Sequence, residues 1–122
     1  MPPTRVVIYC DENGEAPFIQ WGLRLPAVAQ DKVRLRAARL AELGHEMRRP
    51  EADYLRDGIY KLRAAVRGVQ YRVLYFFHGR EAVILTDGLT KEQRVPDREI
   101  DIALRRKRLF EQHPGKHTLK GL

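Results

Sequence analysis

Residues 59–77, IYKLRAAVRGVQYRVLYFF, alternate between apolar and polar side chains as β-strands do, and this pattern indicates the fold class. The dipeptide Arg67-Gly68 interrupts the alternation with a turn signal. A further run follows a second short turn, so the strand-like runs are 59–64, 70–77 and 82–87. Short turns between such runs predict an antiparallel meander.

The same stretch concentrates positive charge without a neighbouring acid. Because side chains alternate between the two faces of a strand, Lys61 and Arg63 share one face, and a suitable register would bring Arg72 beside them. If Tyr60 and Leu62 face the helices, these cations lie on the open face of the sheet. Such a face suits phosphate binding. The alternative is a solvated surface that discourages edge pairing.

The segments on either side of the meander complete the predicted fold. We expect a strand at 5–10, helices at 15–25 and 27–43, a connecting loop at 45–58 and a last helix from Pro96. The order β-α-α-β-β-β-α predicts an α+β domain whose antiparallel-rich sheet is packed by helices on one face. We assign a single domain to residues 1–111 and a flexible C-terminal tail to residues 112–122.

The charge balance favours a polyanionic partner. The 122 residues contain 23 basic and 16 acidic side chains, which gives a net charge of +7 and a pI near 9.9. Nucleic acid or an acidic protein would suit this charge, and solubility alone is the simpler alternative. The sequence shows neither a signal peptide nor an apolar run of membrane-spanning length, so we expect a cytoplasmic protein.

No residue pattern indicates a metal or a cofactor. Cys10 is the single cysteine, which excludes an intramolecular disulfide and a cysteine-based zinc site. His113 and His117 are four residues apart, but Pro114 and Gly115 between them argue against a helical metal-binding pair. Glycine-rich phosphate-binding motifs are also missing from the sequence. We therefore expect chemistry without metal and without a small-molecule cofactor.

Two longer stretches resemble a known family. They are LRDGIYKLRAAVRGVQYRVLYFFHGREAVIL and, overlapping the loop after the last strand, DGLTKEQRVPDREIDIAL. Together they resemble the RelE/HigB toxin superfamily, in particular the phage-derived HigB-like branch of type II toxin–antitoxin systems. Residues 55–110 carry the likeness, and the first 54 residues match only in the order of elements. The resemblance implies a RelE-like fold and a ribosome-dependent endoribonuclease that cuts mRNA in the ribosomal A site, together with a cognate helix-turn-helix antitoxin.

The resemblance also implies which residues act on RNA. The functional cations of the family fall on Lys61, Arg63, Arg72, Lys91 and Arg94. Cleavage without metal uses the 2′-OH as nucleophile, and it needs a proton acceptor, a proton donor and positive charge beside the phosphate. Arginine suits the phosphate clamp, while Lys61 or Lys91, crowded by cations, would have a lowered pKa and act as base. Further RNA-binding candidates are Arg67, Tyr71, His78, Arg105 and Arg106.

Two acids depart from the family pattern. Asp87 and Glu92 stand near the predicted site, where each would weaken phosphate binding or supply a general base instead. Because one fold hosts several activities, two alternatives stay open. One is a toxin of the same fold that acts on DNA gyrase, and the other is a catalytically inactive module that binds RNA or an antitoxin. Trp21 is interpreted as a core residue, or, if exposed, as an antitoxin anchor.

Overall fold

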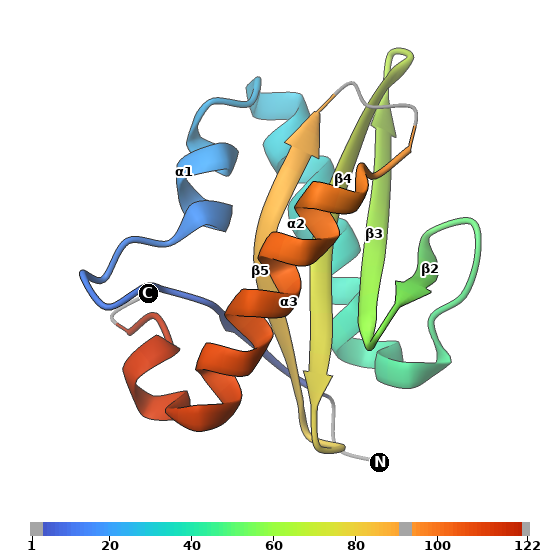
Figure 1. Ribbon diagram of the computed structural model, residues 1–122. Helices are drawn as coiled ribbons and strands as arrows, with labels where there is room; N and C mark the ends of the chain where they lie inside the picture. Colours follow the sequence, from blue (N-terminus) through green and yellow to red (C-terminus); the bar gives the residue numbers. More distant parts are fainter. Residues whose placement is uncertain (1–3, 91–93, 121–122) are drawn as a thin grey trace.

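The strands and helices lie close to their predicted positions. The computed structural model describes residues 4–90 and 94–120. Its main elements are β1 (Arg5–Ile8), α1 (Pro17–Leu23), α2 (Ala27–Leu43), β2 (Ala52–Arg56), β3 (Ile59–Val66), β4 (Val69–His78), β5 (Ala82–Thr90) and α3 (Asp97–Gln112) (Figure 1). None of the described helices combines the length and the apolar character that crossing a membrane would require.

One sheet organises the molecule. Its strand order is β1-β5-β4-β3-β2, with β1 parallel to β5 and every other pair antiparallel. The predicted α+β class and the meander β3-β4-β5 are therefore confirmed. Arg67 and Gly68 join β3 to β4, and both have positive φ angles, of 51° and 81°. A two-residue hairpin turn with this geometry requires glycine or a tolerant residue, which explains Gly68.

The segment 45–58 was predicted to be a loop, and this prediction is wrong. It contains β2, which pairs with β3 at the edge of the sheet and continues through the turn Asp57-Gly58. The sequence of β2, ADYLR, offers only two large apolar residues and no Val or Ile, so its propensity for strand is weak. Pairing with β3, rather than local preference, makes this segment a strand.

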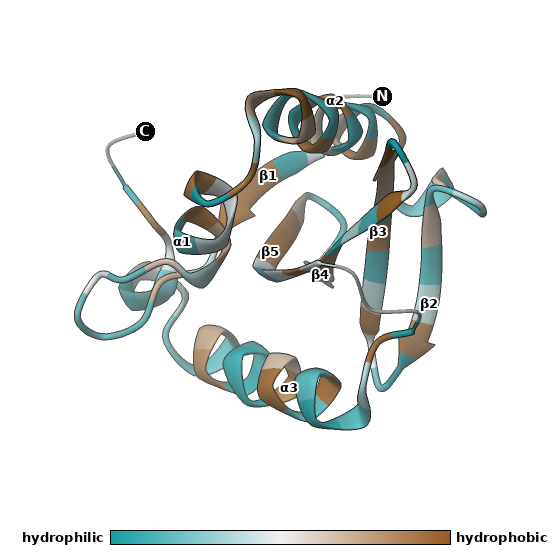
Figure 2. Ribbon diagram, turned by 90° about the horizontal axis from the view of Figure 1, so that it is seen from above, coloured by the Kyte–Doolittle hydropathy of each residue, from teal (hydrophilic) through white to brown (hydrophobic). Residues whose placement is uncertain are grey.

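Helices cover both faces of the sheet, not one. Figure 2 shows α1 and α2 on one side of the strands and α3 on the other. The first face is packed by a core that includes Trp21, Leu40 and Tyr75. The second face buries Ile100 and Phe110 of α3 against residues of β3, β4 and β5, namely Ile59, Leu74, Phe76 and Ile84. The face that was expected to be open is therefore partly closed by α3.

The end of the chain is packed rather than loose as far as it is described. A short 3-10 helix, Pro114–His117, turns the chain back toward β1. His117 is 1% exposed, its ring stacks on Tyr9 at a centroid distance of 5.3 Å, and its Nδ1 lies 2.8 Å from the carbonyl oxygen of Cys10. The amide of Leu119 then donates to the carbonyl oxygen of Ile8 at 2.9 Å. These contacts cover part of the outer edge of β1, which differs from the expectation of a flexible tail.

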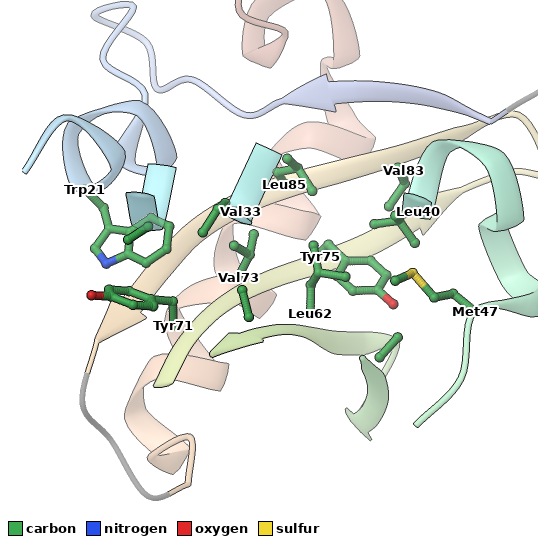
Figure 3. Packing of buried hydrophobic residues seen from close by; sticks show 13 residues of the cluster. Trp21, Val33, Leu40, Met47, Leu62, Tyr71, Val73, Tyr75, Val83 and Leu85 are labelled. Atoms are coloured by element: carbon green, nitrogen blue, oxygen red, sulfur yellow. The ribbon is translucent and has the colours of Figure 1, made fainter. Parts of the chain in front are cut away.

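Trp21 is a core residue, and a glycine makes room for it. Figure 3 shows its indole beside Tyr71 at one end of the packed cluster. The indole nitrogen Nε1 donates to Thr90 Oγ1 at 2.8 Å. The six-membered ring lies against Gly88, where a Cβ atom would overlap it. A buried tryptophan therefore requires glycine at this position of β5.

We predict that Gly88→Ala destabilises the fold by about 3 kcal/mol, because a methyl group cannot fit against the indole without moving β5 or α1. Gly22→Ala is the control, since nothing lies within 4 Å of its added methyl group. That substitution should stabilise α1 by about 0.5–1 kcal/mol through the better helix propensity of alanine. Urea unfolding of both variants measures the two effects, and equal stability of the variants would contradict the packing described.

Candidate functional site

The register of β3 and β4 gathers three cations on one face of the sheet. Arg63 lies directly opposite Arg72, and Lys61 lies opposite Leu74. Residues that face each other across an antiparallel pair point to the same side, which here is the side of α3. The predicted grouping of Lys61, Arg63 and Arg72 is confirmed as an arrangement in space. We call these three residues the cation cluster.

The members of the cation cluster differ in burial. Arg72 is only 5% exposed, because it lies on the central strand between Arg63 on β3 and Leu89 on β5. Lys61 and Arg63 are half-buried. Two arginines directly opposite each other repel, at a cost of a few tenths to about 1 kcal/mol. The register therefore concentrates three cations at this end of the sheet.

Arg63 is held in place by polar contacts. Its Nε donates to Gln70 Oε1 at 2.7 Å, and its backbone amide donates to the carbonyl oxygen of Glu51 at 2.7 Å. Gln70 shares the face of Arg72 because the two residues are two positions apart in one strand. Gln70 was not among the residues predicted from the sequence, although the same alternation places it on this face.

Burial lowers the pKa of Lys61, and the positive charge of Arg72 lowers it further. Asp53 raises this pKa by a smaller amount, while Arg63 acts in the same direction as Arg72. Asp53 faces Lys61 across the pair of β2 and β3, and its Oδ1 accepts a hydrogen bond from Arg49 Nε at 2.9 Å. A lysine in this setting carries a larger fraction of neutral amine, which can accept a proton. Asp53 was missed because its segment was predicted to be a loop.

The family resemblance places the loop after β5 over the cation cluster. This loop starts at the same end of the sheet as the cluster. Leu89 of β5 pairs with Arg72, and β5 ends one residue later at Thr90. Lys91 and Glu92 lie outside the described residues, so their predicted roles stay predictions. Arg94 is exposed just before α3.

Three of the predicted RNA-binding residues lie away from the cation cluster. Tyr71 points to the opposite face and packs on Trp21, with ring centroids 6.5 Å apart, so its ring belongs to the core. His78 lies at the other end of β4 and packs edge-on against Phe110 at 5.1 Å. Arg67 is exposed in the hairpin turn, two positions beyond the cluster-facing residue Ala65.

Arg106 is a structural residue. Its guanidinium lies 3.1 Å from Asp87 Oδ2 and over the ring of Tyr9, 6.0 Å from the centroid. Asp87 is buried between β5 and α3 and also accepts a hydrogen bond from Thr86 Oγ1 at 3.0 Å. Burial raises the pKa of Asp87, and the charge of Arg106 opposes this shift. Arg105, which immediately precedes Arg106 in α3, is exposed.

Metal binding finds no support in the part of the chain that the structure describes. Among residues 4–90 and 94–120, the side chains of His, Cys, Asp and Glu form no group of three that could hold an ion. The cation cluster itself supplies three chemical groups. These are two permanent cations that can bind a phosphate and one amine whose pKa is lowered.

A comparison with protein families identifies the chain. The family described as phage derived protein Gp49-like (DUF891) matches residues 20–108. The chain belongs to this family. The match runs from α1 to the last turns of α3, so it includes the whole cation cluster and begins well before residues 55–110, which carry the resemblance in the sequence. The Gp49-like family is related in fold to the RelE/HigB toxins. No curated protein matches the chain.

We predict that Arg106→Met destabilises this Gp49-like protein by about 3 kcal/mol, because it leaves the buried Asp87 carboxylate without its cation. Arg105→Met, one residue away and exposed, should change stability by less than about 0.5 kcal/mol. Thermal and urea unfolding of the two variants measure the difference. Equal losses would show that the ion pair contributes nothing to the fold.

We predict that Lys61→Met stabilises the protein at neutral pH, since the protonated amine is disfavoured by burial and by Arg72. A lysine whose pKa is lower in the folded state makes the wild type gain stability as pH rises through that value toward 10.5, the ordinary value for the unfolded chain. The advantage of the variant should therefore be largest near pH 7 and shrink above it. Urea unfolding at several pH values tests this, and a pH-independent difference would contradict the lowered pKa.

Proposed function

We propose that this Gp49-like protein is the toxin of a type II toxin–antitoxin system and acts as a ribosome-dependent mRNA endoribonuclease. The observation that carries the proposal is the gathering of Lys61, Arg63 and Arg72 on one face, with a lowered pKa for the lysine. Membership of a family related to the RelE/HigB fold supports the same function. The net charge of +7 suits an RNA substrate.

The proposed reaction needs no metal. The neutral amine of Lys61 takes the proton of the 2′-OH, and the 2′-oxygen forms a bond to the adjacent phosphorus. The bond from phosphorus to the 5′-oxygen breaks, and that oxygen receives a proton. The products are a 2′,3′-cyclic phosphate and a 5′-hydroxyl end. In the proposal, Lys91 or Arg94 of the loop after β5 acts as the donor or as a further phosphate contact.

Arg63 and Arg72 serve as the phosphate clamp in this mechanism. A guanidinium is a cation whose planar shape matches two phosphate oxygens at once. Charge on the two nonbridging oxygens grows in the transition state, so fixed cations lower the barrier. Gln70 orients Arg63 for this contact through the hydrogen bond to Nε.

We also propose that a cognate antitoxin, a helix-turn-helix protein, restrains the toxin. This partner follows from the proposed class of toxin, and the basic surface suits an acidic protein. Copurification with a coexpressed helix-turn-helix candidate, and loss of toxicity on coexpression, would test the pairing.

The test is to add the purified protein to a translating extract and map the 5′ ends of a reporter mRNA. We expect cuts in phase with codons that leave 5′-hydroxyl ends. Lys61→Met and Arg63→Gln should each reduce cleavage by at least about 100-fold, the usual contribution of a general base or a charge-stabilising group. These half-buried residues are better targets than Arg72, whose burial couples its removal to folding.

Arg34→Gln is the matched control, because it removes an exposed arginine from α2 on the opposite side of the sheet. It should cut like the wild type. Intact mRNA with a folded wild-type protein would overturn the nuclease proposal. DNA damage signalling with unaffected translation would point to gyrase, and RNA binding without cuts would point to an inactive module.

A further inference from the structure

A cavity lies where the loop after α2 leads into the edge strand β2 (Figure 1). Its volume is about 450 Å³, within the range of about 300–1,000 Å³ that small-molecule sites occupy. Tyr60, one of its lining residues, packs with the core beneath α1 and α2, whereas its neighbour Lys61 points to the side of α3. The cavity therefore lies on the other face of the sheet from the cation cluster. We call it the edge pocket, and its polar and aromatic lining residues are His45, Arg48, Arg49, Asp53, Tyr54 and Tyr60.

Tyr54 gives the edge pocket an exposed aromatic ring that is held in a fixed position. This residue is 53% exposed, although it lies in a strand. Its ring packs edge-on against Tyr60 at 5.1 Å, and Tyr60 stacks on the buried Tyr75 at 5.3 Å. Its hydroxyl oxygen accepts a hydrogen bond from the backbone amide of Gly58 at 3.0 Å. The ring is thus ordered before any ligand arrives, so stacking on it costs little conformational entropy.

The aromatic character of this exposed side chain sets it apart in the molecule. Among the residues that the structure describes, the other large apolar side chains that are exposed are aliphatic and lie on α1 and α2, namely Leu23, Val28 and Leu35. An aliphatic side chain offers hydrophobic contact alone, whereas a tyrosine ring also offers a π face. His45 adds a second ring to the lining, since it is exposed and stacks on Phe77 at 3.6 Å. Rings of this kind stack with planar heterocycles such as nucleobases.

Two arginines in the lining supply positive charge. Arg49 donates from Nε to Asp53 Oδ1 at 2.9 Å, and its side chain is 80% exposed. Within residues 4–90 and 94–120, its two terminal amino groups form no further hydrogen bond. Arg48 is exposed and pairs with no carboxylate in the same part of the chain. Because Asp53 is already bonded to Nε of Arg49, the remaining guanidinium N–H groups are available to an anion.

An aromatic ring next to available guanidinium groups matches a nucleoside phosphate. The base would stack on the tyrosine, and the phosphate would accept paired hydrogen bonds from a guanidinium. A protein partner is the competing occupant, since Tyr and Arg also dominate interface hot spots. The residues that adjoin the pocket, Glu46, Arg48 and Arg49, are charged and exposed, so the apolar surface is confined to the cavity. A confined cavity favours a small molecule over a protein interface, which needs about 800 Å² on each side.

We propose that the edge pocket binds a nucleoside monophosphate, with the base against Tyr54 and the phosphate at Arg48 and Arg49. A free nucleotide and the 5′ end of an RNA chain both offer this chemistry. Because the site lies on a different face from the cation cluster, binding there would not require mRNA cleavage. A protein that cuts no mRNA would still bind the nucleotide.

The test is an NMR titration of the isotope-labelled protein with the 5′-monophosphates of the common nucleosides. It measures affinity and also reports which backbone amides shift. We expect saturable shifts in the segment 45–54 and at Tyr60. Unphosphorylated nucleosides and inorganic phosphate are titrated in parallel, because they test the base contact and the phosphate contact separately. Circular dichroism checks the fold of each variant.

Substitutions in the pocket separate the two contacts. Tyr54→Leu should weaken binding of nucleotides and of nucleosides by at least about 5-fold, since it removes a base–aromatic stack. Tyr54→Phe keeps the ring and should retain most of the affinity. Arg48→Gln/Arg49→Gln should weaken nucleotide binding by at least about 10-fold, the effect of a lost charge-assisted hydrogen bond, and leave nucleoside binding unchanged. Its control, Arg24→Gln/Arg39→Gln, removes the same charge from exposed positions outside the pocket and should keep full affinity.

The cation cluster is a second place where a phosphate would bind, and Lys61→Met/Arg63→Gln tests it. This variant should bind nucleotides at the edge pocket as the wild type does. Loss of binding in this variant, with none in Tyr54→Leu, would place the nucleotide at the cation cluster and overturn the proposal. Two other results would also overturn it. They are the absence of saturable shifts with every nucleotide, and equal losses in the two double arginine variants, since net charge alone would then explain the binding.

A 5′-phosphorylated pentanucleotide distinguishes the two sources of the ligand. It is titrated into the Lys61→Met/Arg63→Gln variant, so that the cation cluster contributes little to its binding. Tighter binding than that of the mononucleotide assigns the edge pocket to the end of an RNA chain, and weaker binding assigns it to a free nucleotide. The result is separable from the nuclease test. A wild-type protein that binds the nucleotide and cuts no mRNA would contradict the proposed function alone.

Discussion

Strand β4 is buried on both of its faces, and the rest of the structure follows from this constraint. The run from Tyr71 to Phe76 has no exposed residue, because α1 and α2 pack on one face and α3 on the other. Arg72 lies within this run. The guanidinium is buried because of its position in the sheet, although a charged group by itself favours water. Charge is thereby concentrated where the sheet is least solvated.

The burial of β4 also affects the electrostatics of the neighbouring strand β3. Lys61 lies one strand away, and both its own burial and the charge of Arg72 lower its pKa. Arg63, directly opposite Arg72, relies on Gln70 for its orientation. A bound phosphate would place negative charge beside the three cations of the cluster. The same geometry thus accounts for the concentration of charge and for its proposed use.

The inner and outer sides of helix α3 have different roles. Its inner side closes the second core and holds the ion pair of Arg106 with Asp87, which ties the helix to β5. Its outer side exposes Arg98, Arg105 and Arg108. Arginines of one run, RRKR, therefore have different surroundings: Arg106 pairs with the buried Asp87, whereas Arg105 and Arg108 are exposed.

The sequence by itself determined the meander, the bounds of α2 at residues 27–43, and the shared face of Lys61, Arg63 and Arg72. These features follow from local rules, since alternation and helical spacing need only the neighbouring residues. The strand β2, the placement of α3 on the second face and the packing of His117 were decided by the tertiary structure alone. An amphipathic helix shows which side it buries but not which face of a sheet receives it. Burial of Arg72 and Tyr71 depends on that choice, because the segments that cover them come from distant parts of the chain.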